Sequence, residues 1–254
     1  MIPSIRAEAR KLFTVRSTYV ILVICTAILV FFAYYIEGFR QATDVVNTDK
    51  LSTDVTAVAQ ALNLFVPFAG VLLMTHEYRY NTILYTLTSA SNRLKVLLAK
   101  IIVITIFSVG VIAIGSLLAP VLTQLGLQAH NLTMAHQELH LGNLILRTAF
   151  YGWGYSMLAL IIAALVRSQV ASIAILLLFP GIVETLLALL LRGKAIYLPF
   201  NALARVLQDK STSVGTGGLG QDNLSLSGAV IVVVLYLIFG WTVAAILFLK
   251  RDAN

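Results

Sequence analysis

Six apolar stretches, each about twenty residues long, constrain this chain more than any other feature of its sequence. They fall at about 17–36, 57–76, 96–119, 144–166, 170–191 and 228–249. A helix needs roughly 20 apolar residues to cross a hydrocarbon core of about 30 Å. Backbone groups in lipid must be hydrogen-bonded within their own segment, so each stretch is expected to be helical. The sequence therefore predicts an all-α integral membrane protein, a single domain over residues 1–254 with six transmembrane helices.

The composition agrees with a membrane location. Of the 254 residues, 59% are hydrophobic and only 11% are charged, whereas soluble domains carry about 25% charged residues. The first apolar stretch lacks a small-residue cleavage pattern, so we expect a lasting anchor and not a removed signal peptide. The single cysteine, Cys25, leaves no partner for a disulfide within the chain and excludes a cysteine-rich metal site.

The distribution of basic residues predicts the orientation in the membrane. Six spans place both termini on one side, and eleven of the 18 lysines and arginines fall on that side. The opposite side has longer loops and a much lower density of basic residues. Because cytoplasmic loops are enriched in lysine and arginine, both termini are expected to be cytoplasmic. The net charge of +7 fits contact with anionic membrane lipids and requires no nucleic acid.

The segment before the first span has the pattern of an amphipathic helix. Its apolar residues share one helical face: Ile2, Ile5, Ala9, Leu12 and Phe13. Ser4, Arg10 and Lys11 lie off that face, and Arg16 precedes the span. The pattern predicts a helix in the membrane interface that leads into the first span. The alternative is a solvated basic tail.

The loop between the second and third spans also has a helical pattern. In EYRYNTILYTL, residues 77–87, apolar side chains recur at i, i+3, i+4 and i+7, namely Tyr80, Ile83, Leu84 and Leu87. A short amphipathic helix of this kind either floats on the membrane or docks in a groove of a partner. An inert connector is the third possibility. Between the fifth and sixth spans, AIYLPFNALARVL is too short to cross a bilayer, and we expect it on or dipping into the outer membrane surface.

Several of these residues resemble motifs of a known family. The order Glu77, Thr82, Ile83, Arg93, Ala99 and Lys100 is similar to the loop of type-2 ABC transporter permeases. The segment around Glu8, Lys11, Arg16 and Ser17 resembles that family's N-terminal segment. YLPFNAL, residues 197–203, looks like an element found before the last span in a branch that includes bacteriocin and bacitracin-type exporters.

The resemblance implies a division of labour between chains. It implies an amphipathic coupling helix that docks on an ABC ATPase subunit, present in two copies that hold ATP and magnesium. It also implies a second permease subunit, identical or homologous, and the cytoplasmic membrane of a bacterium. The expected substrate is amphiphilic: an antimicrobial peptide, a drug or a lipid. The alternative is a membrane sensor or regulatory module without transport.

The residues themselves agree with a separate source of energy. No Gly-x-x-x-x-Gly-Lys-Ser/Thr stretch occurs in the chain, so it has no phosphate-cradling loop of that kind and is not expected to be an ATPase. The force would then enter through cytoplasmic helices. We expect the apolar face of residues 77–88 to insert into the ATPase, with a polar contact from Glu77. Thr82 and Arg93 complete the predicted coupling set.

Polar residues inside the spans are candidates for lining a substrate pathway. Glu184 falls in the outer half of the fifth span, where a carboxylate is costly and usually faces a bundle interior. We interpret it as a pathway or gating residue, as half of a structural ion pair with Arg147, or as a charge accommodated by local adjustment of the lipid. Gln60 and Asn63 in the second span favour a helix that faces inward or toward a partner subunit.

Three further patterns carry less functional meaning. Pro67 and Pro180 are expected to kink their helices. Small residues such as Gly152 and Gly154 in the fourth span favour close helix packing over a protease site. His136 and His140 lie in an outer loop that we interpret as solvated polar sequence, so no metal or other cofactor is predicted on this chain. The alternative is that their spacing places two imidazoles on one helical face to bind a metal.

Overall fold

The computed structural model describes residues 2–40, 48–80, 93–129, 131, 141–207 and 224–250. The regular structure in these ranges is helical throughout, and they contain no β-strand. Within them, six helical ranges are long and apolar enough to cross a membrane: Arg16–Ile36, Val55–Arg79, Leu94–Gln128, Gly142–Val166, Gln169–Leu191 and Leu226–Phe248. The predicted all-α, six-span membrane architecture is confirmed.

The first half of the chain forms α1 (Ile2–Thr14), α2 (Arg16–Leu29), the π-helical η1 (Val30–Arg40), α3 (Thr48–Leu62), α4 (Val66–Arg79) and α6 (Arg93–Gln128). The second half forms α7 (Leu141–Val166), α8 (Gln169–Leu178), the π-helical η2 (Phe179–Val183), α9 (Glu184–Leu191), the 3₁₀-helical η3 (Arg192–Tyr197), α10 (Pro199–Leu207) and α11 (Leu226–Lys250).

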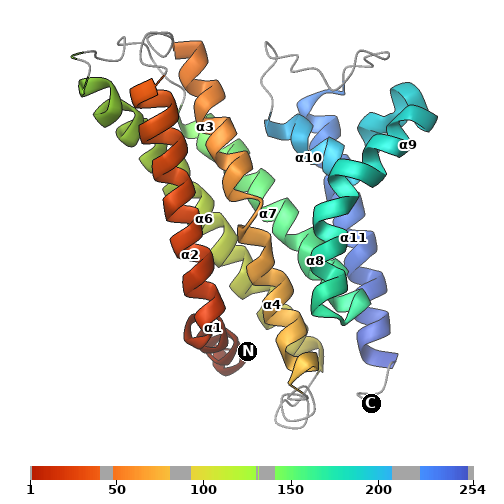
Figure 1. Ribbon diagram of the computed structural model, residues 1–254. Helices are drawn as coiled ribbons and strands as arrows, with labels where there is room; N and C mark the ends of the chain where they lie inside the picture. Colours follow the sequence, from red (N-terminus) through yellow and green to blue (C-terminus); the bar gives the residue numbers. More distant parts are fainter. Residues whose placement is uncertain are drawn as a thin grey trace.

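The long helices run side by side as a bundle (Figure 1), and α7 contacts other helices on two of its sides. On one side α7 packs against α4 and α6, and on the other it packs against α10 and α11. The short helix α1 lies at the end of the bundle where α11 finishes, and we name this the α1 end. The short helix α10 lies at the opposite end, the α10 end.

The two prolines that were expected to bend helices sit at interruptions. A turn at residues 63–65 separates α3 from α4, and Pro67 occupies the first turn of α4. Proline is tolerated there because its missing N–H would have no partner in a first turn. Pro180 lies inside η2, the widened turn between α8 and α9.

The third span extends well beyond its predicted end at residue 119. The prediction stopped before Pro120, but α6 continues through this proline to Gln128. Ala119, Thr123 and Leu127 are buried at four-residue spacing, so one packed face continues past the proline. At 1.5 Å per residue, 36 residues span about 54 Å, which exceeds a hydrocarbon core of about 30 Å. Burial of this face offsets the hydrogen bond that the proline removes.

Two glycines of α7 allow close approach to neighbouring helices, as the small-residue pattern predicted. A Cβ atom on Gly152 would lie 2.5 Å from Cγ1 of Ile112 on α6. A Cβ atom on Gly154 would lie 2.5 Å from Cδ2 of Leu203 on α10. Both distances are too short for real Cβ contacts, so a larger residue at either position would force the neighbouring side chain to shift.

The apolar segment before the last span is part of the bundle. It forms α10, whose buried residues are Phe200, Ala202, Leu203, Val206 and Leu207. These side chains lie against α7 and α11, so their apolar area is removed from the surroundings by the protein's own helices. The segment therefore packs against helices of its own chain, where Gly154 of α7 leaves room for Leu203, and its expected place at the outer membrane surface stays a prediction.

Candidate functional site: a ring of ion pairs at the α1 end

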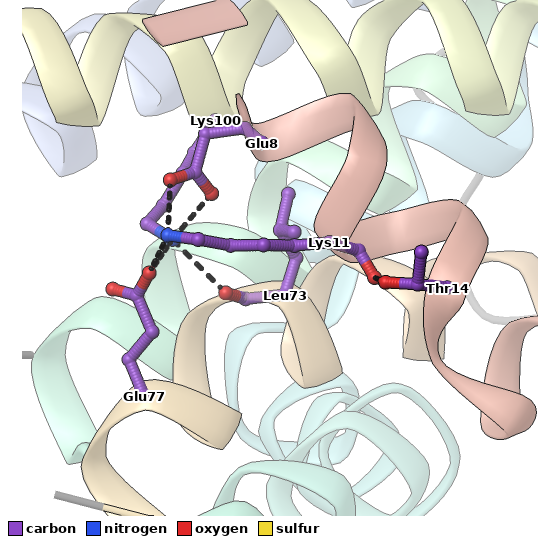
Figure 2. Close-up of polar contacts among 6 residues, drawn as sticks. All are labelled: Glu8, Lys11, Thr14, Leu73, Glu77 and Lys100. Atoms are coloured by element: carbon purple, nitrogen blue, oxygen red, sulfur yellow. Dashed lines mark hydrogen bonds and ion pairs between the residues drawn. The ribbon is translucent and has the colours of Figure 1, made fainter. Parts of the chain in front are cut away.

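Four charged residues from three helices form a closed ring of ion pairs at the α1 end (Figure 2). Glu8 and Lys11 come from α1, Glu77 from the last turn of α4, and Lys100 from the start of α6. Glu8 and Lys11 are three residues apart, the spacing at which side chains meet on one helical face. Two lysines and two glutamates make the ring electrically balanced.

The ring is closed by short contacts. Nζ of Lys11 lies 2.7 Å from Oε1 of Glu8 and 2.5 Å from Oε1 of Glu77. Nζ of Lys100 lies 2.8 Å from Oε2 of Glu8 and 3.1 Å from the same Oε1 of Glu77. Lys100 also donates to the backbone carbonyl of Leu73, at 3.1 Å. Each glutamate thus bridges both lysines, and Lys100 uses all three of its N–H donors.

The ring is largely removed from solvent. The side chain of Lys100 is 0% exposed, those of Glu8 and Glu77 are 3% and 5% exposed, and that of Lys11 is 38% exposed. Burial of charged groups costs several kcal/mol per ion unless each charge is paired and hydrogen-bonded. Burial acts to lower the pKa of Lys11, but the hydrogen bonds from Glu77 and Glu8 outweigh it and raise that pKa above its ordinary value.

The ring lies on the helices at both ends of the segment 81–92. Glu77 lies three residues before residue 80, and Lys100 lies seven residues after residue 93, so residues 81–92 connect the two helices that carry them. Lys11 joins α1 to α4, and Lys100 joins α6 to α1. The ring therefore fixes the two helices that flank residues 81–92 to each other and to the N-terminal helix.

The structure corrects the expected packing of α1 at two positions and shows where the carboxylate of Glu77 lies. Glu8 is buried and Lys11 faces the ring, whereas the helical pattern placed Lys11 off the packed face. Ile2 of the predicted apolar face is exposed. Within this chain the carboxylate of Glu77 turns inward to two lysines, and its expected polar contact with an ATPase stays a prediction. A buried carboxylate gains more from two ammonium groups than from a contact at the surface.

The other predicted residues of α1 have different environments. Leu12 is buried, Arg10 is exposed, and the ring of Phe13 makes an edge contact with Phe107 of α6 at 6.3 Å between centroids. Arg16 is the first residue of α2 and not part of α1. The predicted helix is confirmed, and its placement in the membrane interface stays a prediction.

Most of the predicted coupling segment lies outside the described residues. This applies to Thr82, Ile83, Leu84 and Leu87, and to the side chain of Arg93, at whose position α6 begins. Tyr80, which follows α4, is 63% exposed, and the guanidinium of Arg79 lies 5.7 Å from its ring centroid. An exposed aromatic ring at this position is compatible with contact to a partner, and the docking role stays a prediction.

Glu184 caps a helix and forms no ion pair with Arg147. Its Oε1 accepts from the backbone N–H of Phe200 and its Oε2 accepts from that of Asn201, both at 2.9 Å. These amides belong to the first turn of α10, where backbone N–H groups have no partner within the helix. The side chain is 1% exposed, so capping accounts for this carboxylate. The ion-pair interpretation was wrong, and a role in the pathway stays a prediction.

The two polar residues of the second span do not share an environment. Gln60 is exposed, whereas Asn63 is buried at the turn between α3 and α4. Among the residues that the structure describes, neither the oxygen nor the nitrogen of the Asn63 amide has a hydrogen-bond partner. Within the described ranges no three His, Cys, Asp or Glu side chains are grouped to hold a metal ion. His136 and His140 fall outside those ranges.

Sequence reasoning had singled out all four ring residues without grouping them. Each was a position of the motifs that resemble type-2 permeases, yet Glu8 and Lys100 were assigned no role. Comparison with known proteins now adds a direct finding. Residues 4–183 match the family described as ABC-2 family transporter protein, and this range includes the whole ring. No curated protein matches the chain significantly.

Proposed function

The chain belongs to the ABC-2 family of transporter proteins as a multi-pass membrane component, and from this premise we propose that it is the permease subunit of an ATP-driven exporter. A separate ABC ATPase subunit, in two copies, supplies the energy and holds ATP and magnesium. Two permease subunits, identical or homologous, enclose the pathway. The substrate is an amphiphile such as an antimicrobial peptide, a drug or a lipid. The protein resides in the inner membrane of a bacterium with both termini in the cytoplasm, where its basic residues concentrate.

The observation that carries this proposal is the ion-pair ring at the base of residues 81–92. A force applied to that segment acts on α4 and α6 where Glu77 and Lys100 are tied to α1. Separating buried ion pairs costs several kcal/mol, so the three helix ends move as one body. The ATPase presses on the apolar face of residues 80–87, and the ring transmits that displacement to the spans. Glu77 thus acts as a positioning residue and not as a contact residue.

The first experiment tests for the ATPase subunit itself. The tagged chain is purified from its native membrane in mild detergent, and bound proteins are identified by mass spectrometry together with ATP hydrolysis. We expect a co-purifying ABC ATPase, lost in Leu84→Asp because a charge on the apolar face prevents docking. Leu219→Asp is the matched control, since it places the same charge in the predicted outer loop. Absence of any nucleotide-hydrolysing partner, or equal loss in both variants, would contradict the proposal.

A further inference from the structure

A cavity of about 1010 Å³ opens beside the ion-pair ring at the α1 end. Its walls come from α1, the start of α2, the last turns of α4, the first turn of α6 and the first residue of α8. Part of the wall is apolar, including Leu12, Val15, Leu72, Leu73 and Val96. The polar part of the wall includes Ser17, Gln169 and two arginines, Arg16 and Arg79. A compartment of this volume accommodates a ligand of drug size.

The charges around the cavity leave a surplus of two positive groups. The acidic residues among its lining are Glu8 and Glu77, and both carboxylates are already held by the two lysines of the ring. Arg16 and Arg79 therefore face the cavity without a carboxylate to neutralise them. Along the sequence, no acidic residue occurs between Glu77 and Glu138, so the adjoining segment 81–92 brings none.

Both arginines line the cavity and carry N–H groups that can bind an anion. Arg16 is exposed and forms no hydrogen bond or ion pair with the residues that the structure describes. Arg79 donates one hydrogen bond from Nη1 to Oε1 of Gln169, at 3.1 Å, and stacks on Tyr80. Those contacts fix the plane of its guanidinium and leave other N–H groups available. A guanidinium with free N–H groups binds phosphate oxygens in a bidentate manner.

We propose that this cavity binds the head of an anionic phospholipid, with Arg16 and Arg79 on the phosphate and the apolar wall against the glycerol and the start of an acyl chain. The site lies where the first, second and fifth spans begin or end, which is the level of lipid headgroups in a bilayer. Basic pockets between spans on the cytoplasmic side suit such headgroups. A soluble anion would use the arginines but not the apolar wall. The proposal does not depend on which substrate the transporter moves.

The test measures lipid binding to the full chain by native mass spectrometry. The purified, delipidated protein is titrated with dioleoyl phosphatidylglycerol, tetraoleoyl cardiolipin or dioleoyl phosphatidylcholine, in the parent and in the variant Arg16→Gln/Arg79→Gln. We expect the double variant to bind both anionic lipids about tenfold or more weakly, as loss of charge-assisted hydrogen bonds implies. Phosphatidylcholine should bind weakly and equally to both proteins, because its choline cancels the phosphate charge.

The matched control is Arg6→Gln/Arg10→Gln. It removes the same charge from α1 at two exposed arginines that do not line the cavity, and its lipid binding should stay within about twofold of the parent. Equal losses in both double variants would mean general surface attraction and would overturn the proposal. A third variant, Arg16→Lys/Arg79→Lys, keeps the charge but not the bidentate geometry, and should bind at an intermediate level. Unfolding temperatures of all variants confirm that each is folded.

Competition identifies the source of the phosphate. Millimolar glycerol phosphate and inorganic phosphate are added to the lipid-bound protein. Little displacement supports the lipid, whereas full displacement at low millimolar concentration would assign the site to a soluble phosphate and reject the lipid. If the double variant keeps its lipid but loses an ATPase subunit, the cavity is a protein-docking site and the proposal fails.

Discussion

Two glutamates inside the spans have buried carboxylates that are stabilised by different kinds of partner. They are Glu77 at the α1 end and Glu184 at the α10 end. Both are almost fully buried. Glu77 is held by two ammonium groups from other helices, one of them 66 residues away in sequence. Glu184 is held by two backbone N–H groups only 16 and 17 residues away. Glu77 therefore forms ion pairs with distant segments, whereas Glu184 accepts backbone hydrogen bonds from a nearby stretch of the same chain.

The difference shows that a carboxylate within a span is not in itself a sign of a transport pathway. Glu184 stabilises the start of α10 and keeps that helix packed between α7 and α11. Glu77 links α4 to α1 and α6 at the base of the segment that we expect to meet an ATPase. Loss of the charge on Glu77 should therefore affect the packing of the whole α1 end, whereas loss of the charge on Glu184 should affect only the start of α10.

The largest effect is expected when the fully buried lysine of the ring is removed. Lys100→Met leaves Glu8 and Glu77 with one shared cation between them, which should destabilise the fold by about 3–5 kcal/mol. The measurement is the unfolding temperature of the purified protein in detergent. Lys194→Met, an exposed lysine at the other end, is the control and should change little. A Lys100→Met protein as stable as its control would show that the ring is not closed in solution.

The substitutions Glu77→Gln and Glu184→Gln compare the effects of the two carboxylates on stability and transport. Glu77→Gln leaves an unbalanced positive charge in the ring and should cost about 2–3 kcal/mol, while Glu184→Gln retains one accepting oxygen and should cost about 1–2 kcal/mol. Transport should fall strongly only in Glu77→Gln, with the ATPase still bound, because the ring transmits movement. Substrate-stimulated ATP hydrolysis in proteoliposomes is the measurement. Loss of transport in Glu184→Gln at unchanged stability would restore the pathway role of Glu184.

A smaller effect is expected at the accessible member of the ring. The side chain of Lys11 is 38% exposed, so water screens its pairs with Glu8 and Glu77. Lys11→Met should therefore destabilise the fold by about 1 kcal/mol, well below the cost of Lys100→Met. The unfolding temperatures of the two variants are compared in the same detergent. Equal losses would mean that the ring is buried throughout by a partner subunit.

The smallest effect concerns pH and follows from the sign of the Lys11 shift. Its folded pKa lies above the ordinary value of 10.5, so its stabilising contribution is fully present below about that pH and is lost as pH rises through the folded value. Between pH 7 and 9 the stability difference between the parent and Lys11→Met should stay constant. Unfolding at several pH values measures this difference, and a decline before pH 9 would show that Lys11 is not held by both glutamates.

The α1 end also illustrates where sequence reasoning succeeded and failed. The helix α1 was predicted from apolar spacing, yet its most informative residue, Glu8, sits among those apolar side chains and is buried. A periodicity argument counts a charged residue on that face as a mismatch. Only the positions of Glu77 and Lys100 show that the charge has partners. The resemblance to type-2 permeases pointed to these residues, although it could not show that they touch.

The sequence by itself determined the class of this protein: six helical spans, the N-terminal helix and the absence of a phosphate-cradling loop of its own. The helices follow from hydrophobic length and local backbone hydrogen bonding, which depend on residues close together in the sequence, and the absent loop follows from a missing sequence motif. The tertiary structure alone decided that Lys11, Glu8, Lys100 and Glu77 close a ring, that Glu184 caps α10, and that α10 fills the space beside Gly154. These contacts form because an unpaired buried charge or an empty volume would destabilise the fold. The residues that fill or pair with them come together only in the folded bundle.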